Sequence, residues 1–531
     1  MMIKKPSFGQ YFELPNPGLW AYLKHNVTGN SEDYRPPFWK GESREAVLAR
    51  WQSKIDALGI EKRYPGLYQF EMDMKSKVGP MSIQAPLEDR IGSIEDYFTQ
   101  IKTESEPISD EAIARTIRFF SRGGGIRLRS LERTVEQMRL STNSGNPWFT
   151  KRRAVKDEIV RSNIFQLGSD WMIGTPSRDY KLAAVLGWRG QEGGISEENV
   201  KQRVVWMMSA GLNIHELRFY QPAIAAMQRN KLIPAYVSMD AVDDEVTALF
   251  HTKGTDDAVI CTDFTKFDQH FNRDMQDAAL AVEQRLSATT DNECFRVFRA
   301  KFEIPIICSE NLMYYGQHGM GSGSGGTNFD ECMSHKCLQF EAAQKVGKQL
   351  NPHSMAYGDD GILTYPGIDV DNVIQTYTSH GQEMNESKQY VSTHDCVVLR
   401  RWHGTEYTVQ GNMVGVYATF RALGRLLAQE RFYDPEKWSA EMVTLRALSI
   451  IENCKWHPLF HKFIDFVITG DKYELGLGLS GFFDRLDSLA RKSNEYFEDF
   501  LGYTKTLQSE GVYTGGISNW EVVKYLKSKL K

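Results

Sequence analysis

Two segments decide the fold: AVICTDFTKFDQHFN (residues 258–272) and SMAYGDDGILTY (residues 354–365). In the first, a short apolar, β-prone run leads to Asp263, and Asp268 follows shortly after it. In the second, two β-prone runs flank Asp359 and Asp360, which glycines enclose; glycine supplies the positive φ that a tight hairpin turn requires. The two segments predict a strand that ends in an aspartate and a hairpin with two aspartates at its tip.

The aspartates Asp263, Asp359 and Asp360 predict a site for hard cations. Neighbouring carboxylates raise each other's pKa unless something neutralises them. Three carboxylates on two adjacent strands suit two divalent cations, the clamp used for in-line phosphoryl transfer. Each signal is weak alone, because Asp-Asp pairs also occur at 243–244 and 256–257, where surface turns explain them, and Asp263 suits a helix cap equally well.

A glycine-rich loop, GMGSGSGGTN (319–328), lies between the two segments. Its glycines fit GxGxxG, but no βαβ unit surrounds them, as a dinucleotide site requires. A lipase-type GxSxG pattern and a phosphate-binding GxxxxGK[ST] motif are both absent. We interpret the segment as a loop that lets the backbone approach a ribose or a nucleic-acid backbone. A helix is predicted after it, over 328–346.

Cys332, His335 and Cys337 lie on that predicted helix. They suggest a metal site, but no second pair follows at zinc-finger spacing. Core packing is the better interpretation.

Composition excludes several classes of protein. The 531 residues carry 63 Lys and Arg against 68 Asp and Glu, a net charge of -5, which excludes a protein that is basic all over but not a local basic channel. Seven cysteines, an odd number, argue against a disulfide scaffold and for a reducing compartment. No secretory signal or membrane-spanning stretch is visible, so we expect no membrane association.

The order of elements along the chain is helical, then mixed, then helical. We predict helices over 43–58, within 95–140 and over most of 415–531, with a strand-rich region at 234–405. This order does not suggest a doubly wound sheet. Basic residues in 187–206 could hold a triphosphate or form a solvated face.

Taken in order, DFTKFD, SGSGGT and YGDD resemble motifs A, B and C of viral RNA-dependent RNA polymerases, most closely those of the picobirnaviruses. Residues 142–147 resemble motif G, residues 201–203 motif F and GQEMNESKQ (381–389) motif D, while CVVLRRWHG (396–404) is a loose match to motif E. Each motif alone is common, whereas seven in this order are specific.

The resemblance implies a role for each matching residue. Two Mg²⁺ ions, or Mn²⁺ in their place, would be held by Asp263 and Asp359 with Asp360 assisting, and Lys388 would protonate the departing pyrophosphate. The residues implied for nucleotide binding are Arg189, Lys201, Arg203, Asp268, Ser322, Thr327 and Asn328. Those implied for template binding are Thr142, Gly145, Pro147 and Gly323.

Motif B departs from the commoner pattern, because its final asparagine position holds Glu331 and an asparagine stands at 328 instead. We expect Asn328 to help Asp268 recognise the ribose 2′-hydroxyl. A second carboxylate beside Asp268 would cost free energy unless it were protonated, whereas an amide both donates and accepts without charge.

The family fold implies a right-hand polymerase of mixed α/β (α+β) class, with encircling fingers, an antiparallel palm sheet with helices, and a helical thumb. The implied boundaries are an N-terminal arm at 1–70, fingers at 71–233, palm at 234–272, a fingers insertion at 273–305, palm at 306–410 and thumb at 411–531. Implied partners are RNA template and product, nucleoside triphosphates and a capsid protein, with a double-stranded RNA genome and a location in the virion interior and host cytoplasm.

Two other functions compete with this hypothesis. A reverse transcriptase also has a Tyr-x-Asp-Asp turn, but it usually places a bulky aromatic residue where this chain has Asp268. A capsid or scaffold protein would have no reason to combine three carboxylates with a Gly/Ser loop.

Overall fold

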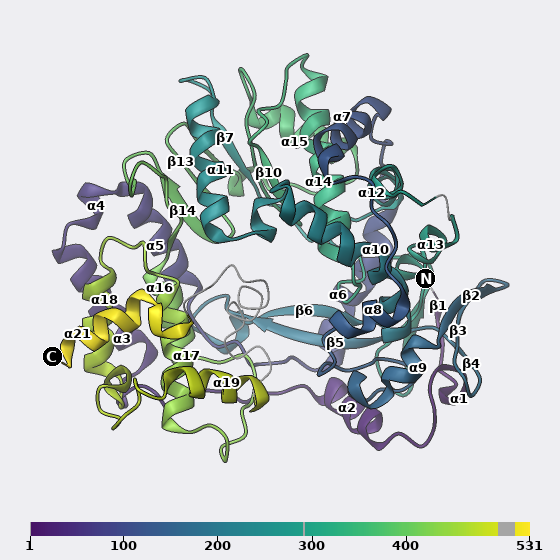
Figure 1. Cartoon of the computed structure of the whole chain (residues 1–531), viewed down its shortest axis with the longest axis horizontal. Helices are drawn as coiled ribbons and strands as arrows, with labels where there is room; N and C mark the ends of the chain where they lie inside the picture. Colours follow the sequence, from purple (N-terminus) through teal and green to yellow (C-terminus); the bar gives the residue numbers. More distant parts are fainter. Residues whose placement is uncertain (1, 290–291, 497–515, 531) are drawn as a thin grey trace. The chain divides into compact units, whose positions relative to one another are not determined.

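The computed structural model describes residues 2–289, 292–496 and 516–530, and the chain divides into two compact units (Figure 1). The first unit contains residues 1–29, 85–189 and 203–398. The second contains residues 30–84, 190–202 and 399–531. Each unit is therefore built from segments that lie far apart in the sequence, and the first 70 residues, predicted as one arm, are shared between the two.

A four-stranded antiparallel sheet belongs to the first unit. Its strands follow the order β10 (Met355–Tyr357), β11 (Asp360–Leu363), β7 (Val259–Thr262) and β12 (Tyr390–Ser392). All four residues of β7 are buried, which explains why this strand is a continuous run without polar alternation. The predicted strand and the predicted hairpin are both confirmed.

One helix connects this sheet to the rest of the core. α14 (Thr327–Lys345) contacts β10 and the helices α7 (Asp110–Phe120), α12 (Arg273–Leu286) and α15 (Val370–Ser379). Most of its residues are buried, polar ones included, because neighbours cover it on several sides. Most side chains of α14 therefore reach the interior.

Two further sheets belong mainly to the first unit. One has the order β1 (Met2–Ile3), β9 (Met313–Tyr315), β8 (Ile306–Ile307), β5 (Ala184–Gln191) and β6 (Lys201–Met207). The other has the order β2 (Asn163–Leu167), β3 (Asp170–Gly174) and β4 (Asp179–Lys181). The remaining elements are α1 (Phe8–Tyr11), α2 (Pro17–Thr28), α6 (Leu87–Thr99), α8 (Leu131–Gln137), α9 (Lys156–Val160), α10 (Ala210–Arg229), α11 (Met239–Thr252), α13 (Asn292–Val297) and β13 (Asp395–Val398).

The second unit joins helices from the N-terminal part of the chain to C-terminal ones. Its elements are α3 (Arg44–Ala57), α4 (Ile60–Arg63), α5 (Pro65–Lys77), β14 (Arg401–Gly404), β15 (Val416–Tyr417), α16 (Thr419–Leu427), α17 (Ala440–Glu452), α18 (Phe460–Gly470), α19 (Leu486–Tyr496) and α21 (Glu521–Lys529). The buried carboxylate of Glu71 accepts hydrogen bonds from the backbone N–H of Thr419 at 2.7 Å and of Phe420 at 3.1 Å. A carboxylate at the start of α16 satisfies free N–H groups and is favoured by the helix dipole.

The mixture of helices and sheets confirms the predicted α/β (α+β) class. Within the stretch predicted as mostly helical, 415–531, α16 ends at Leu427, where Ala428 has extended backbone. The domain boundaries drawn from the sequence stay predictions. Within the described ranges, no helix combines the length and the apolar character needed to cross a membrane.

Candidate active site

Strand register brings the three predicted aspartates to one edge of the four-stranded sheet. Tyr357 pairs with Asp360 across the hairpin, so the two-residue turn between them contains Gly358, with φ of 66°, and Asp359. Gly361 pairs with Thr262 on the adjacent antiparallel strand β7. The residues just beyond that pair, Asp360 and Asp263, therefore stand at the same end of neighbouring strands.

The side chains at this edge suit a hard cation by their chemistry. Asp263 and Asp359 are exposed and Asp360 is half-buried. Carboxylate oxygens are the ligands that Mg²⁺ prefers. Among the described residues, no three His, Cys, Asp or Glu side chains converge into a ready metal cluster. Ligation by these aspartates therefore stays a prediction, one that the donor set and the register favour.

Glu331, the other candidate in motif B, interacts directly with Asp268. Burial raises the pKa of Asp268 to about 6; the charge of Asp359 raises it further, while a hydrogen bond with Glu331 and the charge of Arg203 lower it. Burial and the charge of Asp268 raise the pKa of Glu331 well above its usual value. The raised pKa of Glu331 favours its protonated form, in which the repulsion that argued against it is removed.

Asn328 faces a different partner. Its Oδ1 accepts a hydrogen bond from the hydroxyl of Tyr236 at 3.0 Å. The expected contact of Asn328 with a ribose 2′-hydroxyl stays a prediction. Both Asn328 and Glu331 begin α14, and the orientation of that helix brings Glu331 to Asp268.

The glycine-rich loop needs its glycines because two elements press against it. A Cβ on Gly323 would lie 1.8 Å from the carbonyl oxygen of Trp206, and one on Gly326 would lie 1.9 Å from the ring of Tyr220. The hydroxyl of Ser322 accepts from the N–H of Trp206 at 3.2 Å, and that of Thr327 donates to the carbonyl of Gly321 at 3.1 Å. Ser322 and Thr327 therefore shape the loop, and their contact with a nucleotide stays a prediction.

A buried charge network supports the same loop and was not foreseen from the sequence. Glu216 on α10 accepts hydrogen bonds from the hydroxyl of Ser324 at 3.0 Å and the N–H of Gly325 at 3.2 Å. Lys301 lies 2.6 Å from Asp330 and 3.7 Å from Glu216, and all three side chains are almost fully buried. Glu216, Lys301 and Asp330 are single charges in separate parts of the sequence, so no sequence pattern predicts this network.

Gln389, the residue after Lys388, hydrogen-bonds to the backbone of Asp263. Lys388 ends the short helix η7 (Glu386–Lys388), and its side chain is exposed. Gln389 donates through Nε2 to the carbonyl of Asp263 at 2.7 Å and accepts from its N–H at 3.0 Å. The sequence predicted a role for Lys388 but not for Gln389. Only the position of Gln389 next to that lysine could have indicated it.

Comparisons with known proteins agree with this geometry. A family model of the viral RNA-dependent RNA polymerases matches residues 193–409. The chain is 48% identical, over the whole length of both chains, to a human picobirnavirus protein described as a potential RNA-dependent RNA polymerase. The chain belongs to the viral RNA-dependent RNA polymerases. The predicted family and enzyme class are thereby confirmed.

Solved structures show the same fold. The crystal structure of the RNA-dependent RNA polymerase of a human picobirnavirus is similar, with a TM-score of 0.93 and 48% identity over 98% of each chain. A mutant of such a polymerase that lacks the insertion loop has a TM-score of 0.91 and 46% identity over 98% of each chain. This polymerase therefore has the fold expected from its motifs.

The predicted template residues form a tight loop in the polymerase. A Cβ on Gly145, whose φ is 63°, would lie 2.5 Å from the carbonyl oxygen of Met208. Gly145 and Pro147 are buried, whereas Thr142 is half-buried and donates to the carbonyl of Arg139 at 3.0 Å. Gly145 and Pro147 therefore set the path of the backbone, and contact with a template stays a prediction for all three.

The predicted basic residues lie on neighbouring strands. Arg189 is on β5 and Arg203 is on β6, and both are exposed in the first unit. Arg203 is near enough to lower the pKa of Asp268. Lys201 is exposed as well and belongs to the second unit.

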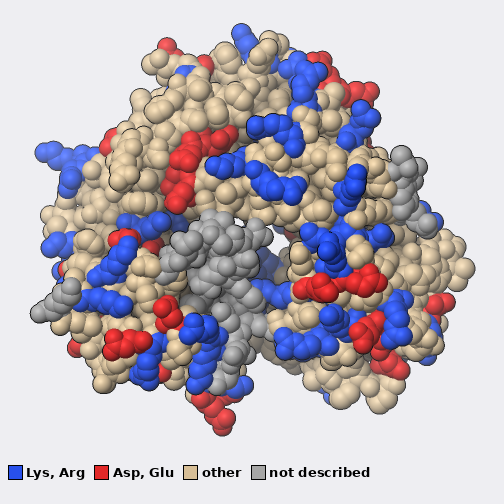
Figure 2. Space-filling view, viewed as in Figure 1, with Lys and Arg blue, Asp and Glu red and all other residues tan. Residues whose placement is uncertain are grey.

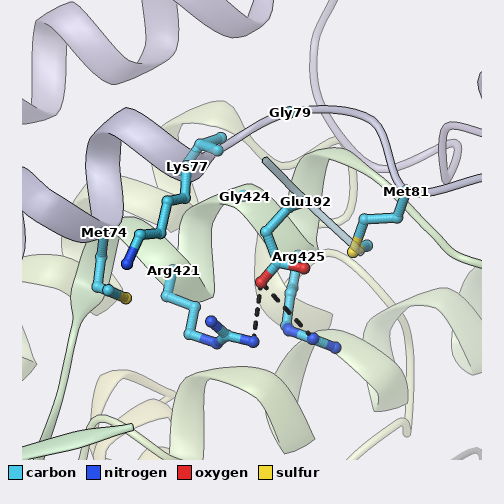
Figure 3. A pocket seen from close by; sticks show the side chains of 9 residues that line it. Met74, Lys77, Gly79, Met81, Glu192, Arg421, Gly424 and Arg425 are labelled. Atoms are coloured by element: carbon cyan, nitrogen blue, oxygen red, sulfur yellow. Dashed lines mark ion pairs between the residues drawn. The ribbon is translucent and has the colours of Figure 1, made fainter. Parts of the chain in front are cut away.

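The segment 190–202, between these strands, is fastened within the second unit by a buried ion pair (Figure 3). Glu192 lies 2.8 Å from Arg421 and 3.8 Å from Arg425, both on α16. Burial raises the pKa of Glu192, but the two guanidinium groups outweigh it and leave the pKa below its usual value. The charged carboxylate therefore anchors this segment to α16.

Proposed function

We propose that the polymerase copies an RNA template by two-metal nucleotidyl transfer from nucleoside triphosphates and releases pyrophosphate. The observation that carries this proposal is the pairing of Thr262 with Gly361, which brings Asp263 and the Asp359–Asp360 turn to one sheet edge. Viral replication requires such an activity of an RNA-dependent RNA polymerase.

The three aspartates would hold the cations. When bound, divalent ions there would lower the pKa of a primer 3′-hydroxyl and stabilise the charge that develops on phosphorus.

Other residues of the chain would bind and orient the nucleotide. The guanidinium groups of Arg189 and Arg203 would bind the triphosphate, with Lys201 from the connecting segment. Asp268 and protonated Glu331 would recognise the ribose 2′-hydroxyl. Lys388 would donate a proton from Nζ to the leaving pyrophosphate oxygen; its side chain is exposed, and the next residue, Gln389, hydrogen-bonds to Asp263.

The deciding experiment is primer extension by Asp359→Asn. We expect synthesis to fall below about a tenth of the wild-type rate, because a neutral amide cannot offset two divalent cations. RNA binding should be unchanged. Asp371→Asn on α15, also an exposed aspartate, is the matched control and should extend normally. Retention of most of the rate by Asp359→Asn would contradict the proposal.

A reverse transcriptase is the alternative function. Asp268 argues against it, because a carboxylate at the sugar favours a substrate with a 2′-hydroxyl. Extension with deoxyribonucleotides alone, at a rate equal to that with ribonucleotides, would favour this alternative. The double-stranded genome, the capsid partner and the virion and cytoplasmic location rest on the resemblance and stay predictions.

A further inference from the structure

Two side chains of α14, about one turn apart, contact the backbone of the turn that carries Asp359. The N–H of Gly358 donates to Sγ of Cys332 at 3.3 Å, and its carbonyl lies 2.9 Å from Nδ1 of His335. A carbonyl oxygen only accepts, so Nδ1 carries the proton. Gly358 is buried, and buried backbone groups cost free energy when they lack partners. The helix thus satisfies both polar groups of the residue before Asp359.

The imidazole of His335 is fixed on its other sides. Its ring meets Phe264 edge-on, with centroids 5.1 Å apart, and Tyr377 at 5.9 Å. A Cβ on Gly361 would lie 2.6 Å from Cε1 of the ring, so the glycine lets β11 rest directly on it. Nε2 has no hydrogen-bond partner among the described residues. The polar contact of this ring is therefore the one to Gly358.

Both groups stay neutral, which suits them to hold a peptide group beside a charged site. Burial lowers the pKa of His335 to about 4 and raises the pKa of Cys332 to about 12. Cys337, also on α14 and fully buried, interacts instead with Thr116 of α7. The Cys-His-Cys set on this helix is therefore divided between two partners and does not form a metal site.

We infer that Cys332 and His335 are positioning residues that hold the Gly358 peptide and thereby set the place of the Asp359 carboxylate. This inference rests on the proposed function, in which Asp359 binds a catalytic cation. A turn with φ of 66° at Gly358 can move when its hydrogen bonds are lost. Small displacements of catalytic groups reduce the rate of the chemical step more than the binding of substrate.

The first test compares two cysteines of one helix. Cys332→Ala removes the acceptor for the Gly358 N–H, whereas Cys337→Ala removes an equal volume away from the turn. For Cys332→Ala we expect kcat for nucleotide addition to fall about 10–100-fold, with KM for the nucleotide and Kd for RNA unchanged. Cys332→Ser, which restores an acceptor, should recover most of kcat, and Cys337→Ala should keep the wild-type value.

The second test keeps the inference falsifiable if Cys332→Ala does not fold. His335→Leu removes the donor to Gly358, and His335→Asn supplies an amide donor in its place. We expect His335→Leu to lose kcat by about 10–100-fold and to need more Mg²⁺ for half-maximal rate, and His335→Asn to recover both. Wild-type kcat in His335→Leu and Cys332→Ala would overturn the inference, as would equal losses in Cys332→Ala and Cys337→Ala.

Asp359→Asn, measured in the same assay, separates this inference from the function on which it rests. An inactive Asp359→Asn with fully active Cys332→Ala and His335→Leu would overturn the positioning role alone. An active Asp359→Asn would overturn the proposed function and this inference with it.

Discussion

The interaction between Asp268 and Glu331 depends on one proton, because a protonated carboxyl group does not repel a neighbouring carboxylate. Two ionised carboxylates in contact repel, but burial and mutual repulsion keep Glu331 protonated, so that it donates to Asp268. The pair then shares one proton, and its remaining oxygens can accept a hydrogen bond from a 2′-hydroxyl. A site built to bond that hydroxyl rejects a sugar without it, because its buried polar groups are left unpaired.

Substitutions at positions 331 and 328 test this pair. We expect Glu331→Ala to lower the preference for ribonucleotides by about tenfold or more, since an unmet buried group costs about 1–3 kcal/mol. Asn328→Ala should lower it less, the reverse of the expectation from the sequence. The ratio of kcat/KM for ribo over deoxy substrates measures both, and a larger loss in Asn328→Ala would restore the original assignment.

The same pair predicts a dependence on pH. A carboxyl group with a raised pKa is protonated below that pKa, so the contact from Glu331 is present at low pH and is lost as the pH rises through the raised value. Glu331→Gln keeps a donor at every pH. We expect the sugar preference of the wild type to decline at high pH and that of Glu331→Gln to stay level; identical pH profiles would contradict this.

Gln389 joins the loop that follows β7 to the loop that precedes β12. Gln389 makes two hydrogen bonds to the backbone of Asp263. In addition, the N–H of Thr265 in the first loop donates to the carbonyl of Glu383 in the second at 2.9 Å. These contacts connect the aspartate that ends β7 to the loop that carries Lys388. A proton donor held in this way keeps its place relative to the catalytic edge.

Loss of this tie should slow the chemical step. We expect Gln389→Ala to reduce the pre-steady-state rate of nucleotide addition by a smaller factor than Lys388→Leu, for which the loss of a general acid predicts about 10²–10³-fold. Gln389→Glu keeps the acceptor but lacks the donor and should fall between Gln389→Ala and the wild type. A wild-type rate for Gln389→Ala would show that this contact does not support the chemical step. A wild-type rate for Lys388→Leu would show that the lysine is not the proton donor.

The buried cation of Lys301 lies near Glu216 on α10 and Asp330 on α14. Glu216 in turn accepts hydrogen bonds from the glycine-rich loop. Lys301→Met leaves the carboxylates of Asp330 and Glu216 buried without that cation. We expect the free energy of unfolding in urea to fall by about 3–5 kcal/mol, the usual cost of breaking a buried pair from one side. Lys345→Met, an exposed position on α14, should change it by less than about 0.5 kcal/mol. Equal effects of the two substitutions would contradict the role of the network.

The whole chain is acidic, yet its charges are not evenly mixed. On the face in Figure 2, acidic side chains gather over α11, which carries the exposed Asp240 and Asp244. Elsewhere the exposed Arg189 and Arg203 lie on adjacent strands. The net charge of -5 therefore does not describe the local potential that an RNA strand would meet.

Salt should weaken template binding despite this net charge. Neutralising Z phosphates of a single strand gives a slope of about −0.7Z in a log–log plot of affinity against salt. We expect a steep slope for the wild type and a shallower one for Arg203→Ala, measured by fluorescence anisotropy with a labelled RNA. A flat response in the wild type would exclude a basic path for the template.

The sequence by itself determined the class of the fold, the strand that ends at Asp263 and the hairpin that carries Asp359, because apolar runs and turn glycines act locally along the chain. It could not choose between Asn328 and Glu331. Positions three apart lie near the same face of a helix, so spacing leaves both within reach of Asp268. The packing of α14 decides which of the two lies beside Asp268, and it also places Asp330 against Lys301. The pairing of β12 with β7 brings Gln389 to Asp263. Those contacts join residues far apart in the chain, and only the tertiary structure could reveal them.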